Sequence, residues 1–239
     1  MNKRTDRSAG QGLTTMMAPP VTARGARTRA ALKKAARSLF EKQGFQSTSI
    51  NQISTKARMA HGTFYTYFES KEQIFGEIVH DLYIALGQTI VSQPPVVGGD
   101  LSERIERANR GYLSAYQQNA RMMAAVEQAS TLSPPLAAIR RATRVGWIER
   151  NTAAITRWQE RGQIAGNVDP RSAAEILGCM VDRTAYVWVV LEEKVFELEE
   201  ATQQLTRLYC NALGLHYFRD GEAEPGQQGR TRAAGCRSS

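Results

Sequence analysis

The chain has few of the residues that build metal sites or disulfide frameworks. Its 239 residues include three cysteines and three histidines. Cys179, Cys210 and Cys236 are far apart and odd in number, with no C-x-x-C pair, so we expect reduced intracellular thiols. No histidine lies at metal-ligand spacing from a cysteine or carboxylate. We therefore predict no metal and no cofactor.

Sequence motifs of common enzymes are also missing. The chain has no G-x-G-x-x-G, no G-x-x-x-x-G-K-[ST], no G-x-S-x-G and no H-E-x-x-H. Paired acids such as Glu192-Glu193 and Glu199-Glu200 lie beside predicted helix boundaries, where a solvated surface explains them. We predict that the protein is not an enzyme and has no catalytic residues.

Long apolar runs are absent as well. The most apolar stretch, 185–191, is far shorter than the ~20 residues of a membrane span. Lys3, Arg4 and Arg7 near the start are not followed by the apolar segment of a signal peptide. The expected location is the cytoplasm, with the protein on the nucleoid and not in a membrane.

What remains is a pattern of helices without alternating strands or repeats, which predicts an all-α fold. Leu32, Ala35, Ala36, Leu39 and Phe40 form a helical stripe that Gly44 should end. Further helices are expected over 70–91, 101–129, 134–162, 170–193 and 197–213.

The segment 48–71 is the most informative part of the chain. Ile50, Ile53 and Ala57 form one apolar helix face, and Thr48 or Ser49 stands where an N-cap is wanted. The short piece 58–60 can turn the chain into a second helix. There Phe64 and Phe68 should point inward, while the outer face carries His61, Thr63, Tyr65 and Tyr67. A short helix displayed in this way suits the DNA major groove.

The charge of the chain is also distributed unevenly along the sequence. Residues 1–76 hold 13 Lys and Arg against 4 Asp and Glu, whereas the remainder holds 18 against 19. The excess positive charge therefore lies in the predicted DNA-binding third, as attraction to phosphates requires.

The stretch GTFYTYFESKEQIF resembles the signature of the TetR family of transcriptional regulators, and the resemblance runs from about Arg27 to Ile78. Two turn positions depart from it: Arg58 stands where the family usually has Gly, and Ala60 where it has Ser or Thr. The resemblance implies a helix-turn-helix motif at about 49–68 within a DNA-binding domain, 25–78. A helical effector-binding and dimerisation domain, 79–218, would follow. Residues 1–24 and 219–239 are expected to be disordered tails, and translation could instead begin near Met16-Met17.

Roles in DNA binding follow partly from the residues and partly from the resemblance. The resemblance implies that Tyr67 and Lys71 touch phosphates and that Thr63 and Tyr65 lie near base edges or sugars. Gly62 either permits close approach to DNA or relieves a clash within the domain. Asn51 either pairs with adenine or faces solvent. The predicted DNA-binding set is Thr48, Asn51, His61, Gly62, Thr63, Tyr65, Tyr67 and Lys71.

One recognition helix reads only a few base pairs, so we expect a homodimer on a double-stranded DNA operator. The last two helices carry more apolar residues than one edge of a bundle needs, although many could serve the core of their own subunit. The predicted interface residues are Met180, Val187, Leu191, Leu205, Leu208 and Tyr209.

The resemblance further implies a repressor that a small effector releases by moving the fourth helix. Large apolar side chains with interspersed polar groups in 101–162 suit a cavity for an apolar or amphipathic compound, although ordinary core positions are the competing interpretation. Arg183 and Asp182 could pair across a dimer, anchor an anionic ligand or face solvent. The predicted effector residues are Tyr112, Tyr116, Met123, Glu127, Trp147, Asn151 and Arg183. The alternative function is a DNA-binding regulator or architectural protein without a small-molecule effector, either controlled by a protein partner or constitutive.

Overall fold

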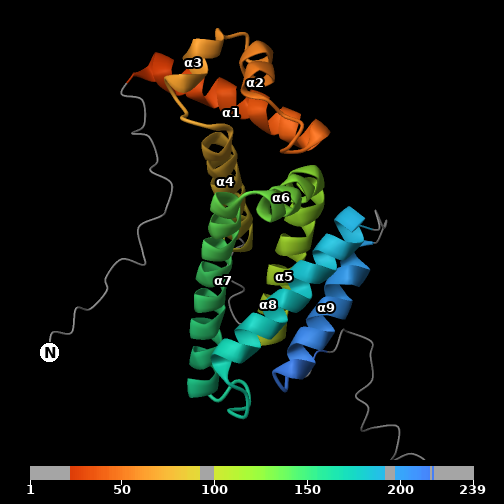
Figure 1. The fold of residues 1–239 in the computed structure, drawn as a ribbon. Coiled ribbons are helices and arrows are strands. Elements are labelled where there is room, and N and C mark those ends of the chain that lie inside the picture. The colour runs from red at the N-terminus through yellow and green to blue at the C-terminus, as the bar shows by residue number, and fades with distance from the viewer. Residues whose placement is uncertain (1–21, 92–99, 192–196, 216, 218–239) are drawn as a thin grey trace, which may run out of the picture.

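A computed structural model describes residues 22–91, 100–191, 197–215 and 217, and all of the secondary structure in these ranges is helical (Figure 1). The prediction of an all-α fold is confirmed. Three helices form a head at one end of the molecule: α1 (Ala23–Gln43), α2 (Ile50–Lys56) and α3 (His61–Tyr65). The predicted tails and the possible start at Met16-Met17 fall almost wholly outside the described residues. α1 nevertheless begins inside the predicted tail, with Thr22 as its N-cap.

The first helix ends where its sequence predicts. Gly44 has φ of 78°, a left-handed conformation that glycine adopts at little cost, and its N–H donates to the carbonyl of Phe40. Phe45 follows and closes the corner. Its ring packs edge-on against Phe75 with the centroids 4.9 Å apart, and Phe75 meets Phe40 in the same way at 4.8 Å. This aromatic cluster joins the head to the next helix.

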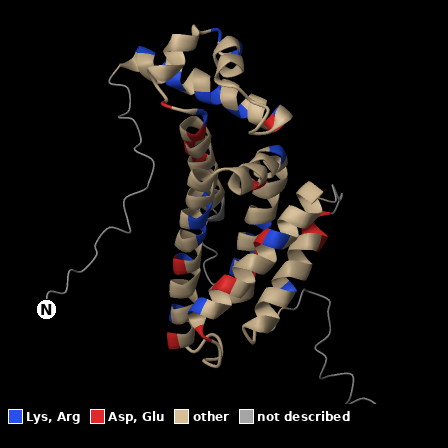
Figure 2. Ribbon diagram, in the orientation of Figure 1, with Lys and Arg blue, Asp and Glu red and all other residues tan. Residues whose placement is uncertain are grey.

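That helix, α4 (Lys71–Val91), runs from the head into the body (Figure 1). One continuous core follows it, from Phe75 beside the head to Leu86 within the body. Ion pairs hold α4 to α1: Glu77 pairs with Arg29, and Asp81 with Lys33. Figure 2 shows basic positions along α1 and acidic positions at the upper end of α4. The head and α4 are therefore joined by both apolar packing and ion pairs.

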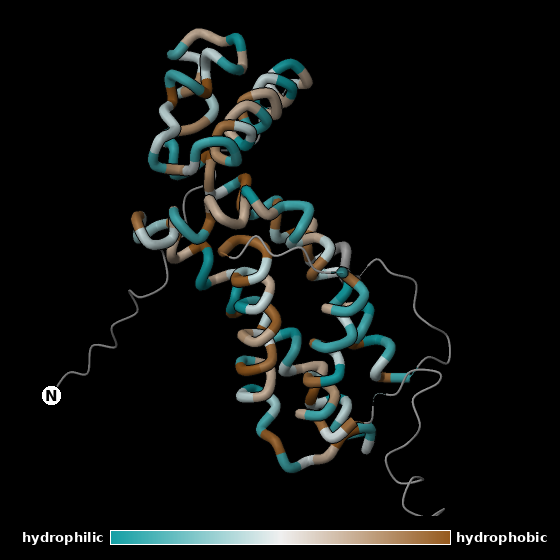
Figure 3. Tube along the Cα trace, turned by 90° about the vertical axis from the view of Figure 1, so that its right-hand side faces the viewer, coloured by the Kyte–Doolittle hydropathy of each residue, from teal (hydrophilic) through white to brown (hydrophobic). Residues whose placement is uncertain are grey.

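The body consists of α5 (Leu101–Gln118), α6 (Ala120–Leu132), α7 (Pro134–Glu160), α8 (Pro170–Tyr186) and α9 (Leu198–Ala212). α8 packs on α7, α9 packs on α5, and α6 lies against α1 of the head. Along each of these helices hydrophobic residues alternate with hydrophilic ones, as Figure 3 shows, because each has a core side and a solvent side. A second core at the far end of the body contains Ile155, Leu177 and Cys210.

The predicted helix over 101–129 is wrong in one respect, because the structure breaks it at Asn119 into α5 and α6. The Asn119 amide donates to the carbonyl of Ala115 at 2.7 Å and accepts from the Arg37 guanidinium of α1 at 2.6 Å. The side chain thus competes with the backbone for hydrogen bonds and ties the break to the head. The helix break was not predicted because no Gly or Pro lies at this position. The end of α8 also departs from a regular helix and forms a π-helical turn, Val187–Leu191.

Candidate DNA interface and effector cavity

The first helix of the predicted DNA-binding motif is capped as its sequence suggests, and the structure selects Ser49 as the cap. The Ser49 hydroxyl accepts from the Gln52 N–H, while the Gln52 side chain accepts from the Ser49 N–H at 2.8 Å. The alternative cap, Thr48, is buried, and its hydroxyl donates to the carbonyl of Gly44 at 2.8 Å. The prediction that Thr48 contacts DNA is therefore wrong for the structure described, because its side chain fills the corner between α1 and α2.

α3 presents the predicted outer face. Phe64 and Phe68 are fully buried, whereas His61 and Tyr65 are exposed, with their ring centroids 5.4 Å apart. Thr63 is half-buried beside them. One face of this short helix thus anchors it in the head, and the other is free for a partner.

Three further predicted DNA-binding residues lie in or near this helix. A Cβ built at Gly62 would meet no atom within 4 Å, so relief of a clash inside the head does not explain this glycine. Close approach to DNA is the interpretation that remains for Gly62. Asn51 is exposed in the first turn of α2. Tyr67 is half-buried, and its ring packs against the core.

The structure gives Lys71 a different role from the predicted phosphate contact. Its ammonium donates to the carbonyls of Phe45 and Thr48, each at 2.9 Å, and to that of Gln46 at 3.4 Å. It also lies over the ring of Phe45, 4.3 Å from the centroid. Burial lowers the pKa of the Lys71 ammonium below its usual range. The side chain therefore pins the loop between α1 and α2 to the start of α4.

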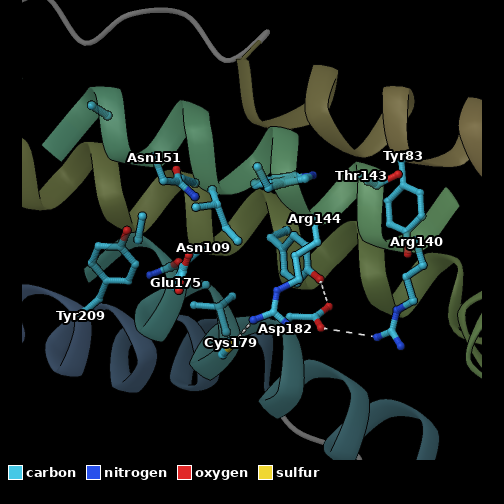
Figure 4. Close-up of a pocket in the computed structure, with 18 of the residues that line it drawn as sticks. Tyr83, Asn109, Arg140, Thr143, Arg144, Asn151, Glu175, Cys179, Asp182 and Tyr209 are labelled. Carbon is cyan, nitrogen blue, oxygen red and sulfur yellow. Dashed lines mark hydrogen bonds and ion pairs between the residues drawn. The ribbon is translucent and has the colours of Figure 1, made fainter. Parts of the chain in front are cut away.

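Within the described part of the body, a cavity of about 1090 Å³ opens between α4, α5, α7 and α8. Tyr112, Trp147 and Asn151, three of the predicted effector residues, line it. So do Asn109, Arg144, Trp158 and Asp182 (Figure 4). A volume of this size is sufficient for a drug-sized molecule.

The other predicted effector residues do not line this cavity. Tyr116 and Met123 are buried in the core. Glu127 lies behind the lining and pairs with Arg140, and Arg183 is exposed, with its guanidinium 4.5 Å from the centroid of the Tyr186 ring. Helical periodicity placed these side chains on plausible faces, but it could not distinguish a core-facing position from a cavity-facing one.

A polar network joins the cavity to α4. Arg140 of α7 donates to the Glu127 carboxylate at 2.8 Å, lies 3.8 Å from Asp182 of α8, and lies beside Tyr83 of α4 (Figure 4). The Tyr112 hydroxyl donates to Asp182 at 2.6 Å (Figure 4). Burial raises the pKa of Tyr83 to about 12, and it raises that of Glu127 although Arg140 opposes the shift.

Sequence analysis missed Tyr83 and Arg140. Tyr83 lies in the helix treated only as a linker, and Arg140 lies in a helix that has few buried residues and no single apolar stripe. One residue in the sequence, Gly76, is consistent with the close packing of α4 against α7. A Cβ at Gly76 would lie 2.7 Å from a side-chain carbon of Ile139, so glycine allows the two helices to come close at this point.

Comparison with known proteins agrees with this geometry. Residues 32–78 match the family described as bacterial regulatory proteins of the tetR family, and residues 105–213 match the C-terminal domain of the transcriptional regulator EthR. Together the two matches cover the head and most of the body. The chain belongs to the TetR family of transcriptional regulators. It is thus a DNA-binding regulator with a helix-turn-helix head, as the resemblance implies.

Individual relatives are distant. The chain is 23% identical to the regulator EthR of Mycolicibacterium smegmatis over 184 residues, which cover 77% of this chain and 85% of that one. It is 40% identical to the repressor NicS of Pseudomonas putida over 62 residues, 26% of this chain and 29% of that one. The solved structure of Salmonella enterica GusR has a TM-score of 0.65 at 21% identity and covers 81% of this chain and 98% of its own.

The TetR resemblance makes the turn between α2 and α3 unusual. Arg58 has φ of 58°, the left-handed conformation for which the family uses Gly. Ala60 occupies the N-cap of α3 without a side-chain hydrogen bond, where the family has Ser or Thr. Both departures should reduce the local stability of the head rather than change its fold.

We expect Arg58→Gly to raise the free energy of unfolding by about 0.5–1 kcal/mol, because glycine adopts positive φ without a Cβ clash. Urea denaturation of the purified regulator measures the change. Arg58→Ala is the control, since it removes the guanidinium but keeps the strained backbone. Equal stability of the glycine and alanine variants would show that backbone strain at this turn is not the cause.

The predicted interface residues differ in exposure: some lie on the surface and others are buried within the subunit. Leu191 and Leu208 are exposed, whereas Leu205 is buried in its own subunit and Tyr209 lines the cavity. Met180 and Val187 are half-buried, Met180 against the subunit's own core. The prediction of an interface role is wrong for the Leu205 side chain. Ile176 of α8, another apolar residue of these two helices, is 68% exposed and joins the exposed apolar group.

No helix in the described ranges is long and apolar enough to cross a membrane.

Proposed function

We propose that this TetR-family protein is a homodimeric repressor that a small apolar or amphipathic effector releases from a palindromic operator. The observation that carries the proposal is the cavity and its lining residue Tyr83, which belongs to α4. A compound that changes the lining can move α4, and α4 shares a continuous core and ion pairs with the head. The cavity favours this function over a regulator without an effector.

On the DNA side, we propose that His61, Gly62, Thr63 and Tyr65 meet the major groove and that Tyr67 and Asn51 lie at its edge. Thr48 and Lys71 act indirectly by holding the loop between α1 and α2. Basic residues along α1 supply attraction to phosphates (Figure 2). Each head reads a few base pairs, and two heads related by a two-fold axis read a palindrome.

Selection of random duplexes on the purified full chain, with the mass of the complex recorded, tests the proposal. We expect a palindromic consensus bound by an even number of chains. Salt-sensitive binding without sequence preference would instead favour an architectural protein. A consensus without two-fold symmetry, bound by a single chain, would contradict the dimer.

The exposed apolar residues of α8 and α9 supply the proposed dimer interface. Leu208 is 57% exposed on α9, and Ile176 lies on α8. We expect Leu208→Glu to convert the dimer to monomers and to weaken operator binding at least about 10-fold, because the two heads lose their mutual effective concentration. Light scattering and a mobility-shift titration measure both effects.

The matched control is Leu132→Glu, which places the same charge at a leucine that is 52% exposed at the end of α6. It should leave both the mass and the affinity unchanged. A Leu208→Glu variant that remains dimeric would place the interface elsewhere.

A further inference from the structure

The charged side chains that line the cavity are mostly arginines. Among the described residues, five arginines line it, and the acids that line it are Glu175 and Asp182, which gives a net charge of +3. The arginines are Arg104 and Arg107 of α5 and Arg140, Arg141 and Arg144 of α7. Residues 77–239 as a whole hold 18 Lys and Arg against 19 Asp and Glu. Positive charge is therefore concentrated on the cavity in a part of the chain that is otherwise nearly neutral.

Some of the charged side chains that line the cavity already have a partner of opposite charge. Glu127 and Asp182 surround the Arg140 guanidinium, and Glu175 pairs with Arg171 outside the cavity at 3.3 Å. In the described structure no carboxylate pairs with Arg104, Arg141 or Arg144. Arg107 already has a partner within the protein, so the positive charge that a ligand would meet belongs mainly to these last three arginines, which are exposed.

Arg144 is the best placed of them. Its guanidinium donates to the Sγ of Cys179 on α8, a neutral and weak acceptor, at 2.8 Å. Figure 4 shows the side chain reaching between α7 and α8, with Asn109 toward one end of the cavity and Asp182 toward the other. Arg141 precedes it by three residues, so both side chains leave α7 on neighbouring positions of one face. A guanidinium with spare donors is suited to a planar anion such as a carboxylate.

The rest of the lining is largely apolar and aromatic. Trp147 and Trp158 of α7 contribute indole rings, and Ile105, Ile148 and Val181 contribute aliphatic side chains. An anionic group alone would leave this apolar surface without a partner, and an apolar molecule alone would make no use of the positive charge of the exposed arginines. The lining therefore suits a ligand that has both parts.

Building on the proposed function, we propose that the effector is an organic anion with a large apolar body and that Arg144 receives its charged group. The apolar body lies against Trp147 and Trp158. Arg144 is exposed, so water weakens its charge-assisted hydrogen bond, and the apolar contacts with Trp147 and Trp158 add to the affinity. The charge of the ligand then decides its affinity.

Three probes with chains of about the same length and head groups of different charge test this inference: decanoate, decanol and decyltrimethylammonium. Calorimetric titration of the full chain should give decanoate a Kd at least about 10-fold lower than that of decanol, with decyltrimethylammonium the weakest. Decanol binding as tightly as decanoate, tighter binding of the cation, or no binding of any probe would overturn the inference.

Variants assign the charge recognition to Arg144. Arg144→Gln should bring the affinity for decanoate down to that for decanol and leave decanol itself unchanged, which also shows that the cavity is still folded. Arg144→Lys should keep part of the preference for the anion. The control is Arg157→Gln, on an exposed arginine of the same helix outside the lining. An equal loss in both glutamine variants would overturn the assignment.

The same samples separate this inference from the proposed function. A mobility-shift assay on the selected operator, with each probe added, reports release. Release by decanol and not by decanoate would overturn the anionic effector while supporting a regulator that an effector releases. Release by decanoate that Arg144→Gln abolishes would support both.

Discussion

Lys71→Ala should lower the free energy of unfolding by about 2–3 kcal/mol, because it leaves the partly buried carbonyls of Phe45 and Thr48 without a donor. The loop between α1 and α2 would lose its tie to α4, and Ser49, the cap of α2, directly follows that loop. Urea denaturation and the salt dependence of DNA binding together distinguish the possible roles. The slope of log affinity against log salt concentration should stay unchanged, since this ammonium is occupied by backbone carbonyls.

A phosphate contact would give the opposite pair of results. The variant would keep its stability, and the salt slope would fall by about one unit. Lys56→Ala is the matched control, because Lys56 is an exposed lysine in the last turn of α2. Its loss should leave stability within about 0.5 kcal/mol of the parent. A Lys71→Ala protein that is as stable as Lys56→Ala would contradict the structural role.

Arg140→Met should cost the body about 2 kcal/mol at neutral pH. Methionine can fill the space of the side-chain stem, but the substitution leaves the Glu127 carboxylate without its partner and removes the cation beside Tyr83 of α4. The pair is only half-buried, so the cost should stay below that of a fully buried pair whose partner is removed. Urea denaturation of the variant and the parent measures it.

The stability that Arg140→Met loses relative to the parent should decrease as the pH falls. Burial already raises the pKa of Glu127 above its ordinary value of 4.5, and Arg140 opposes that shift. Its removal therefore raises the pKa further. A carboxyl whose pKa is higher in the folded than in the unfolded state favours folding when protonated, so the deficit should shrink as the pH falls toward 4.5. Glu127→Gln combined with Arg140→Met should recover most of the stability at neutral pH. A deficit independent of pH would contradict this account.

The sequence determined those features that depend on near neighbours in the chain. The capping box of Ser49 and Gln52, the inward Phe64 and Phe68, and the helix stop at Gly44 all follow from spacings of three to five residues. Such spacings fix a helix face and a turn because the backbone hydrogen bonds join residues equally close in sequence. The all-α fold was therefore predictable from these spacings, and the family was predictable from the resemblance of GTFYTYFESKEQIF to its signature.

The tertiary structure decided which neighbour each helix face meets. Tyr112 and Tyr116 are one helical turn apart, yet the first lines the cavity and the second is buried in the core. Leu205 and Leu208 likewise divide between the core and the surface. Periodicity marks a residue as apolar and on one side, but a helix inside a bundle has partners on several sides, and their positions depend on contacts far apart in sequence. For the same reason the carbonyls that bind Lys71, and the path from the cavity through Arg140 to Tyr83, emerge only once α4 packs against both the head and the body.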